Sequence, residues 1–379
     1  MREFNIGIAG LGTAANQVLP YFDKVEGVRL AAAADIRPQA REEFTKAHNL
    51  PTYGSIEELC SSNNIDAVWI ETPSHLHAEH VICAAQSGKH VICTKPLAAT
   101  LDECNKMISA SRANDVRLLV GHSKVFDLPI RAIGDITRSG RLGKVIQIDS
   151  WLYNDWLRRP RLAEELNEKK GAGFILRQAP HLVDIANYIS ASPAQSVRAM
   201  SGRWDPNVPS EGNCAALINY ESGAIASMSL NGYGYFDSSE LTWGVGTFGK
   251  VRKSSKPTKR AKAVSDENEK YSHTRDTSLG RSMPFFGLHI ISFERGVIRQ
   301  SPDGLMIYTD KGCEKISLPP NQGRAAELIE LRDALRENRD VFPNGEWGKA
   351  NLEICLALNY SARMGRNVAL KHQATNSEH

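Results

Sequence analysis

The sequence predicts two domains, an α/β domain with a doubly wound parallel sheet and an α+β domain with an open, mainly antiparallel sheet. The first covers residues 1–121 and the second residues 122–379 of the 379-residue chain. In the first part, short apolar runs alternate with amphipathic stretches of helical length, as in a parallel sheet that helices cover on both faces. In the second part, apolar runs follow one another across turn signals, which favours antiparallel pairing.

Five apolar runs of the first domain are expected to be strands. They cover residues 4–10, 28–34, 67–71, 90–94 and 117–120. Helices are expected between them, at 13–24, 38–48, 55–62, 75–87 and 100–114. Capping boxes of the S/T-x-x-E type predict where two of these helices begin. They consist of Ser55 with Glu58 and Thr100 with Glu103.

The second domain is expected to contain five strands and three helices. The strands cover residues 145–153, 197–203, 215–220, 224–230 and 305–308. The helices cover residues 178–190, 324–338 and 346–364, and the last two could pack back on the first domain. Strands that follow one another without helices between them define an α+β domain.

The composition excludes several classes of protein. Lys plus Arg number 46 and Asp plus Glu 43, so a formal charge of +3 gives no reason to expect nucleic acid or an anionic membrane as partner. No run approaches the roughly 20 apolar residues of a membrane helix, and the N-terminus lacks a signal-peptide pattern. The seven Cys lack C-x-x-C spacing, which favours free thiols over disulfides or a Cys-based zinc site. We therefore expect a cytoplasmic protein without a metal site.

One segment, residues 250–262, is unusually basic. It holds seven Lys or Arg and no acidic residue. A solvated surface loop and a phosphate-binding patch both fit such a run, and the acidic residues that follow it favour the loop.

A glycine-rich turn follows the first predicted strand. Its sequence fits G-x-G-x-x-G/A, the fingerprint of a dinucleotide-binding Rossmann domain. It consists of Gly10, Leu11, Gly12, Thr13, Ala14 and Ala15. Gly10 allows the tight turn, Gly12 lets the backbone approach a pyrophosphate, and Ala15 permits close packing of helix on strand. The strand before it makes a dinucleotide site the favoured interpretation over an ordinary glycine-rich turn.

Asp35 ends the second predicted strand, 20 residues beyond Ala15. A carboxylate there accepts hydrogen bonds from the adenosine ribose hydroxyls and repels a 2′-phosphate, which favours NAD. Arg37 lies two residues further on. It could stack on the adenine or pair with a 2′-phosphate, so NADP stays possible.

Two further motifs carry residues suited to acid–base chemistry. Lys95-Pro96 follows the fifth predicted strand, at the sheet edge where ligands of open α/β sheets bind. On the helix predicted at 178–190, His181 and Asp184 lie one turn apart, and a histidine with a neighbouring carboxylate can accept and release a proton. Arg177 would join them if the helix began earlier. Taken singly, each of these residues could instead be an ordinary surface side chain.

In this order, the motifs resemble the glucose–fructose oxidoreductase/inositol dehydrogenase/MocA (Gfo/Idh/MocA) family over nearly the whole chain. The resemblance also rests on the turn Thr72-Pro73-x-x-x-His77. It implies a Rossmann domain that binds a nicotinamide cofactor, hydride transfer at a secondary alcohol, and oligomers formed through the second-domain sheet. The family's motif lysine and histidine correspond to Lys95 and His181. The cofactor site would then include Thr72, Pro73, His77, Lys95 and Pro96.

Short segments of the second half are similar to bacterial phthalate 4,5-cis-dihydrodiol dehydrogenases. They lie at 121–123, 126–127, 159–161, 164–166, 211–212, 232–233, 236–238 and 345–348. The similarity implies oxidation of a carboxylated ring cis-diol to the catechol. His181 would take the hydroxyl proton and Lys95 would steady the oxyanion. The anionic substrate would contact His122, Arg159, Arg161 and Arg177 together with His181.

Two residues depart from the family pattern, in which Glu precedes the motif lysine and an acid lies four residues before the motif histidine. Here Thr94 and Arg177 occupy those positions. Both changes remove negative charge near the expected reaction centre. These departures make a non-catalytic NAD-binding sensor an alternative. A sugar or inositol dehydrogenase, which shares every core motif, is the other alternative.

Overall fold

A computed structural model describes residues 3–12, 14–121, 124–167, 172–251 and 278–374. The chain forms two compact units. Unit 1 consists of Met1–Ser123 and Arg324–Leu352, and unit 2 of Lys124–Gly323 and Glu353–His379. The domain boundary at residue 121 stays a prediction. The predicted site residues Thr13 and His122, and residues 252–262 of the basic segment, lie outside the described residues.

Unit 1 contains the expected parallel sheet. Its six strands lie in the order β3-β2-β1-β4-β5-β6, and all their pairings are parallel. The strands are β1 Phe4–Ala9, β2 Val28–Ala34, β3 Thr52–Tyr53, β4 Ala67–Ile70, β5 His90–Thr94 and β6 Leu118–Gly121. Chain order reverses between β1 and β4, which makes this the point where an open sheet of this kind binds ligands.

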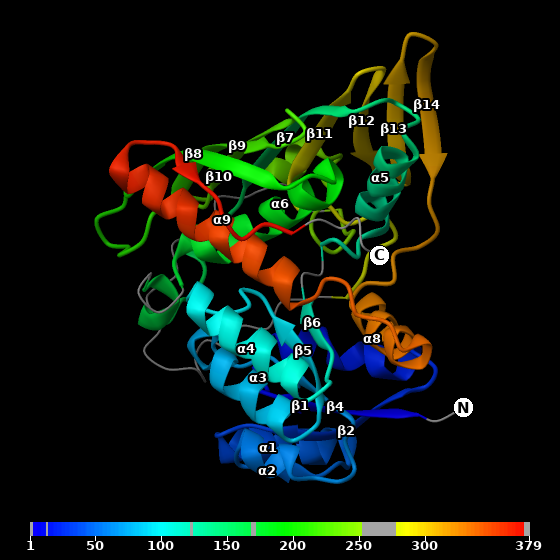
Figure 1. The fold of residues 1–379 in the computed structure, drawn as a ribbon, viewed down its shortest axis with the longest axis vertical. Helices are drawn as coiled ribbons and strands as arrows, with labels where there is room; N and C mark the ends of the chain where they lie inside the picture. The colour runs from blue at the N-terminus through cyan, green and yellow to red at the C-terminus, as the bar shows by residue number, and fades with distance from the viewer. Residues whose placement is uncertain (1–2, 13, 122–123, 168–171, 252–277, 375–379) are drawn as a thin grey trace. The chain divides into compact units, whose positions relative to one another are not determined.

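Helices lie beside this sheet, most of them in the blue and cyan part of Figure 1 and one, from the end of the chain, in orange. They are α1 Pro38–His48, α2 Ile56–Cys60, α3 His77–Gln86, α4 Leu101–Ala113 and, from the end of the chain, α8 Ala325–Glu337. The start of α4 confirms the predicted capping box: Glu103 N–H donates to Thr100 Oγ1 at 3.2 Å, and Thr100 N–H donates to Glu103 Oε2 at 3.0 Å.

The helix expected at 13–24 is a wrong prediction. Two short 3-10 helices, η1 Ala15–Gln17 and η2 Leu19–Lys24, occupy its described part. Pro20 explains the difference, because a proline inside an α-helix lacks the N–H that bonds back and its ring clashes with the carbonyl four residues earlier. The glycine-rich turn is therefore not followed by a long helix with a strong dipole.

Unit 2 contains a nine-stranded sheet in the order β14-β13-β12-β11-β7-β10-β9-β8-β15. Its strands are β7 Val145–Tyr153, β8 Ala194–Gly202, β9 Asn213–Tyr220, β10 Ile225–Asn231, β11 Leu288–Phe293, β12 Gly296–Ser301, β13 Gly304–Thr309, β14 Gly312–Ser317 and β15 Val368–Ala369. Within the described residues, the central pair β7–β10 is parallel and the other pairs are antiparallel. The expected open, mainly antiparallel sheet is thus confirmed.

Two helices, α5 Leu128–Ser139 and α6 Phe174–Ser190, lie on one face of this sheet (Figure 1). The sequence did not predict α5, and α6 begins four residues earlier than expected. Almost every α6 residue is buried, with Arg177 as the half-buried exception. Helix α9, Gly345–Met364, contains the residue at which the chain passes from unit 1 to unit 2.

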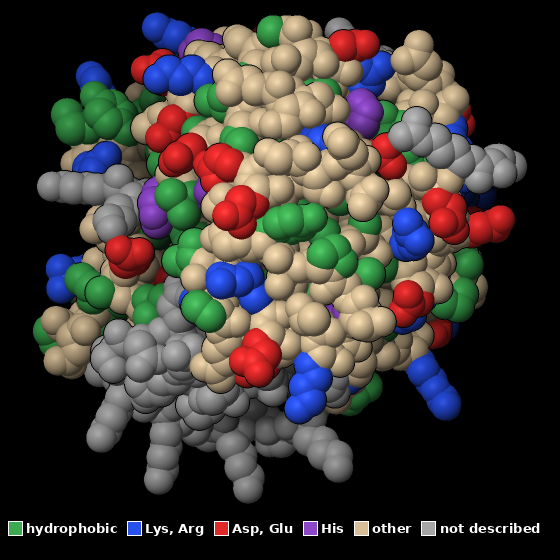
Figure 2. Space-filling model, turned by 90° about the horizontal axis from the view of Figure 1, so that it is seen from below, with side chains coloured by type: hydrophobic (Ala, Val, Ile, Leu, Met, Phe, Trp, Pro, Cys, Tyr) green, Lys and Arg blue, Asp and Glu red, His purple; other side chains and the backbone are tan. Residues whose placement is uncertain are grey.

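The surface shows no single sign of charge on the face in Figure 2, where acidic and basic side chains are interspersed. Among the described residues, no helix is long and apolar enough to span a membrane, and no cluster of three His, Cys, Asp or Glu side chains could hold a metal ion.

Candidate active site

Gly10 brings the end of β1 against the end of β4. Its φ of +96° lies in the left-handed region, and an added Cβ would be 3.0 Å from the carbonyl of Glu71 and from the nitrogen of Thr72. A side chain at residue 10 would therefore occupy the space inside the turn. This is expected of a turn whose backbone comes close to a phosphate group. The predicted neighbours Gly12 and Ala14 are half-buried, and Ala15 is buried.

Asp35 lies beside this turn at the end of β2. Its Oδ2 accepts a hydrogen bond from Leu11 N–H at 2.7 Å, and its Oδ1 accepts one from Arg37 N–H at 2.8 Å. Burial raises the pKa of Asp35, but the hydrogen bonds from Arg37 and Leu11 outweigh it and the pKa lies below its ordinary value. The side chain is thus an ionised acceptor. Ile36, between Asp35 and Arg37, is 83% exposed and offers an apolar surface that the sequence reasoning missed.

His77 ties together the loops that follow β4 and β5. Its Nδ1 lies 2.9 Å from the carbonyl oxygen of Pro96, and its Nε2 lies 2.9 Å from that of Thr72. The ring is fully buried. Pro73, also predicted in the cofactor site, is exposed on the first of these loops. His77 is therefore a structural support of the predicted site.

Lys95 lies where the sequence predicts it, directly after β5. The Lys95–Pro96 peptide bond is cis, a form that the sequence left open. Lys95 is half-buried and Pro96 is buried. Thr94 pairs with Gly121 of β6, so Lys95 extends from the carboxyl edge of the sheet.

In unit 2, His181, Asp184 and Arg177 all belong to α6, because the helix begins early enough to include Arg177. His181 is 9% exposed, and its ring centroid lies 4.4 Å from that of Phe286. Asp184 is fully buried. The spacing of three and four residues places the three side chains along one side of the helix.

A buried lysine that the sequence reasoning missed lies in the same neighbourhood. Lys124 Nζ donates to Asp127 Oδ2 at 3.0 Å and lies 5.9 Å from the ring centroid of Phe286, the ring against His181. Asp127 belongs to one of the short segments that carry the sequence resemblance, which was the available signal. A lysine is rarely buried unless it has a partner, and here Asp127 supplies the opposite charge.

The predicted substrate arginines are held by carboxylates. Arg159 donates to Asp155 Oδ1 at 2.6 Å. Arg161 and Arg177 both approach Glu165 Oε1, at 3.4 and 3.8 Å. Burial lowers the pKa of Arg161 to about 9, so the group still carries its charge at neutral pH. Arg161 and Arg177 therefore approach the same carboxylate, and Arg159 and Arg177 both contribute to lowering the pKa of Arg161.

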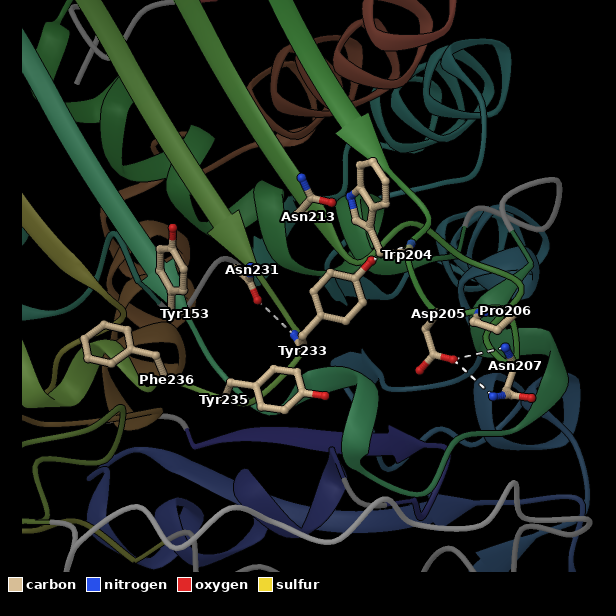
Figure 3. Close-up of a pocket in the computed structure, with 10 residues that line it drawn as sticks. All are labelled: Tyr153, Trp204, Asp205, Pro206, Asn207, Asn213, Asn231, Tyr233, Tyr235 and Phe236. Carbon is tan, nitrogen blue, oxygen red and sulfur yellow. Dashed lines mark hydrogen bonds between the residues drawn. The ribbon is translucent and has the colours of Figure 1, made fainter.

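A pocket of about 600 Å³ opens at the ends of β7, β9 and β10 (Figure 3). Aromatic rings and side-chain amides line it: Tyr153, Trp204, Tyr233, Tyr235, Phe236, Asn207, Asn213 and Asn231, with Asp205 and Pro206. The Tyr233 hydroxyl accepts a hydrogen bond from Trp204 N–H at 2.9 Å. The predicted site residues do not line this pocket, so the sequence reasoning missed it. Its rings and amides suit a flat or cyclic molecule with polar substituents.

The predicted residues thus fall into two sets. Unit 1 holds the glycine turn, Asp35 and Lys95, and unit 2 holds His181 and the arginines. The meeting of Lys95 with His181 stays a prediction.

Comparison with known proteins defines the class of protein. Residues 4–122 match the oxidoreductase family with the NAD-binding Rossmann fold, and residues 130–252 match the Gfo/Idh/MocA C-terminal domain. The chain belongs to the Gfo/Idh/MocA family, and it is an NAD(P)-dependent dehydrogenase.

Three individual proteins illustrate the relationship. The chain is 33% identical over 371 residues to the 1-carboxy-3-chloro-3,4-dihydroxycyclohexa-1,5-diene dehydrogenase of Comamonas testosteroni, with 93% of each chain covered. It is 28% identical over 227 residues to the myo-inositol 2-dehydrogenase of Thermotoga maritima, covering 58% of this chain and 66% of that enzyme. A crystal structure of a Bordetella bronchiseptica RB50 protein described as a dehydrogenase superposes with a TM-score of 0.91, at 33% identity, covering 97% of this chain and all of that one.

Proposed function

We propose that this enzyme oxidises a carboxylated ring cis-dihydrodiol, of the phthalate dihydrodiol kind, to the corresponding catechol. The observation that carries the proposal is the grouping of three arginines: Arg159 and Arg177 lie close enough to Arg161 to lower its pKa, and Arg161 and Arg177 both approach Glu165. Arginine stays ionised and its planar fork matches a carboxylate. The Comamonas relative, similar over nearly the full length, acts on a carboxylated cyclohexadiene diol by its name, which supports the same substrate class here.

The residues of unit 1 fit a bound NAD. The turn at Gly10 and Gly12 would hold the pyrophosphate, and Asp35 would accept hydrogen bonds from the ribose hydroxyls. The exposed side chain of Ile36 offers an apolar surface to the adenine. The loops that His77 ties together would surround the nicotinamide, with Thr72, Pro73, Lys95 and Pro96. When bound, NAD supplies the acceptor for the hydride.

The acid–base work falls to two side chains. His181 would accept the proton of the reacting hydroxyl, and Asp184 would support the histidine from one turn along α6. The Lys95 ammonium would donate to the same oxygen and stabilise its developing negative charge. The ketone formed from a cyclohexadiene diol enolises to the catechol, so aromatisation drives the reaction forward.

A sugar or inositol dehydrogenase is the second candidate. The aromatic and amide-lined pocket in unit 2 favours it, because such a lining suits a neutral ring with hydroxyl groups. The similarity to the Thermotoga myo-inositol dehydrogenase, although it covers about two thirds of that enzyme, points the same way.

A substrate panel separates these candidates. NADH formation is followed with carboxylated cyclohexadiene cis-diols, with the same diols lacking the carboxylate, and with inositols and sugars. Turnover of the carboxylated diols supports the proposal, whereas turnover of polyols alone selects the second candidate. Tight NAD binding without turnover across the panel would instead indicate the non-catalytic sensor.

We also propose that two or four copies associate through the unit 2 sheet and that the enzyme works in the cytoplasm. One face of the sheet exposes apolar side chains on neighbouring strands, such as Met200 at 65%, Leu217 at 47% and Ile225 at 40%. Leu217 of β9 pairs with Ser227 of β10, and Ile225 lies two residues from Ser227 on the same strand. The side chains of Leu217 and Ile225 therefore point to the same face of the sheet. Leu217→Glu should lower the molar mass measured by light scattering, and an unchanged mass would move the interface elsewhere.

A further inference from the structure

Glu71 is a buried carboxyl group that none of the roles above uses. It directly follows β4, and its side chain is 0% exposed. Within the described residues, neither carboxyl oxygen has a hydrogen-bond partner. Buried polar groups are almost always hydrogen-bonded, and an unsatisfied one often belongs to a functional site.

One guanidinium lies between Glu71 and a second buried carboxylate. Arg324 Nη2 is 3.6 Å from Glu71 Oε1, while Arg324 Nη1 donates to both carboxylate oxygens of Glu327 at 2.9 and 3.0 Å. Arg324 precedes α8 and Glu327 lies in its first turn. The start of α8 is therefore held against the end of β4 by charge.

This cluster also reaches the residue before Lys95. Ile70 pairs with Cys93 in the β4–β5 ladder, so the next residues along the two strands, Glu71 and Thr94, are neighbours. The polar groups of Thr94 and of the Trp69 indole lie near the Glu71 carboxyl group and act to lower its pKa, although they do not meet the geometry of a hydrogen bond.

Gly121, at the end of β6, lies beside the same cluster of side chains. A Cβ added to Gly121 of β6 would lie 3.6 Å from the Cα of Thr94 and 3.7 Å from Glu327 Oε1. Glu71, Thr94 and the start of α8 therefore meet beneath the carboxyl ends of β4, β5 and β6.

Lys95 is thus supported from two directions. On one side, His77 contacts the carbonyls of Thr72 and Pro96. On the other, the Glu71 side chain faces Thr94 and Arg324, while the Glu71 backbone lies against Gly10 in the cofactor turn. A change at Glu71 would be transmitted to the segment that carries Lys95.

We propose that Glu71 is a positioning residue for Lys95, whose buried carboxyl group, together with Arg324 and Thr94, fixes the segment 94–96 at the sheet edge. The proposal rests on the catalytic role proposed for Lys95. Glu71 does not touch the substrate in this scheme; it acts through its neighbour on β5.

The charge of the cluster changes near neutral pH. Burial, with a smaller contribution from Glu327, raises the pKa of Glu71 to about 7, and Arg324 opposes the rise. Among the described residues, the buried thiol of Cys93 on β5 also faces it, and burial raises the pKa of that thiol well above its ordinary value. Ionised Glu71 faces Arg324 as a carboxylate, whereas protonated Glu71 becomes a hydrogen-bond donor, so the support of segment 94–96 depends on pH.

The test combines Glu71→Gln with Lys95→Ala in a double-mutant cycle on the holoenzyme. Glu71→Gln should lower kcat roughly 10-fold or more, since a displacement of about 1 Å at a catalytic group can cost about 100-fold. It should also remove an ionisation near pH 7 from the kcat profile, while the Kd for NADH changes little. In the Lys95→Ala background the same substitution should have little effect, because residues that act together are not additive.

Hydrogen exchange gives a readout that needs no substrate. Glu71→Gln should speed amide exchange in the peptide that contains residues 94–99, with unit 2 peptides unchanged as the internal control. The conservative variant Glu71→Asp should retain part of the protection. Returning a carboxylate to the neighbouring strand, in Glu71→Thr with Thr94→Glu, should restore kcat. Glu330→Gln, which removes a paired carboxylate of α8 outside the cluster, should leave the pH profile as in the wild type.

Each outcome has a distinct meaning. A wild-type kcat in Lys95→Ala would show that Lys95 takes no part in catalysis, and this would contradict the role that the proposed function gives to Lys95. A low kcat in Lys95→Ala, with an equal effect of Glu71→Gln in both backgrounds, would overturn the positioning role alone. An unchanged pH profile and unchanged exchange in Glu71→Gln would overturn it as well.

Discussion

Asp35 and Arg37 form a two-point ion pair at the end of β2. Arg37 Nε donates to Asp35 Oδ1 and Arg37 Nη2 donates to Asp35 Oδ2, each at 3.0 Å. Arg37 Nη2 also donates to the carbonyl oxygen of Leu11, at 3.2 Å, in the cofactor turn. The arginine that could bind a 2′-phosphate is therefore paired with the carboxylate that is proposed to repel one, and in the proposed site this pairing would favour NAD over NADP.

We expect Asp35→Ser to shift the enzyme toward NADP. The substitution removes the repulsive carboxylate and releases Arg37, whose charged hydrogen bonds to a phosphate would be worth roughly 1.5–3 kcal/mol. The ratio of kcat/KM for NADP to that for NAD should rise by roughly 10- to 100-fold. Adding Arg37→Ala should abolish the gain. An unchanged ratio in Asp35→Ser would remove Asp35 from the ribose site.

Loss of either proposed acid–base residue should lower turnover without loss of the cofactor. Lys95→Ala and His181→Ala should each reduce kcat by roughly 10²–10⁴-fold, the usual contribution of a positioned proton donor or acceptor. Fluorescence titration with NADH should give a Kd close to that of the wild type. Wild-type kcat in His181→Ala, with chemistry shown to be rate-limiting, would make His181 a packing residue against Phe286 and move the base elsewhere.

The charge of the substrate can be tested at Arg177. Among the three arginines Arg177 has the most exposed side chain, at 27%, against 25% for Arg159 and 16% for Arg161. Arg177→Ala should raise KM for a carboxylated diol by roughly 10- to 100-fold, as expected for a lost charged hydrogen bond of roughly 1.5–3 kcal/mol. Arg159→Ala should act in the same direction.

The matched controls use an uncharged diol and a distant arginine. KM for a diol without a carboxylate should stay nearly constant in Arg177→Ala. Arg141→Ala, which removes an exposed guanidinium paired with Glu314 of β14, should change neither KM. Equal changes in KM for both diols would contradict a contact between Arg177 and the substrate carboxylate, and would favour a polyol dehydrogenase.

Several elements whose apolar runs end at clear turn residues were predicted from the sequence, although β11 and β12 were not. The bounds of β2, β5 and β7 agree with the prediction, and so do those of α1. Strand β14 was not predicted because its residues are mostly exposed and polar, and β15 is only two residues long. Neither pattern contains the alternation by which a strand is detected.

The same limit applies to the site. Lys95 and His181 follow from local motifs, because their positions after a strand and on a helix are set by nearby sequence. Glu71 and Lys124 could not be found in this way, because a charged residue in a sequence looks like a surface residue. Their burial depends on partners from other elements, such as Arg324 for Glu71. Whether these two residues are buried is therefore determined by tertiary contacts between distant segments, which the local sequence does not show.

Glu71 should make the stability of the fold depend on pH. The pKa of Glu71 rises from 4.5 to about 7 on folding, mainly because of burial. Between these values the folded protein holds a proton that the unfolded chain has released, so the free energy of unfolding falls as pH rises from about 4.5 to about 7. The loss of unfolding free energy across this window should be on the order of 3 kcal/mol.

Urea unfolding of the wild type and of Glu71→Gln at several pH values measures this loss. The variant should lack this part of the pH dependence, so its free energy of unfolding relative to that of the wild type should rise with pH. Parallel curves for the two proteins would show that Glu71 does not titrate in this range.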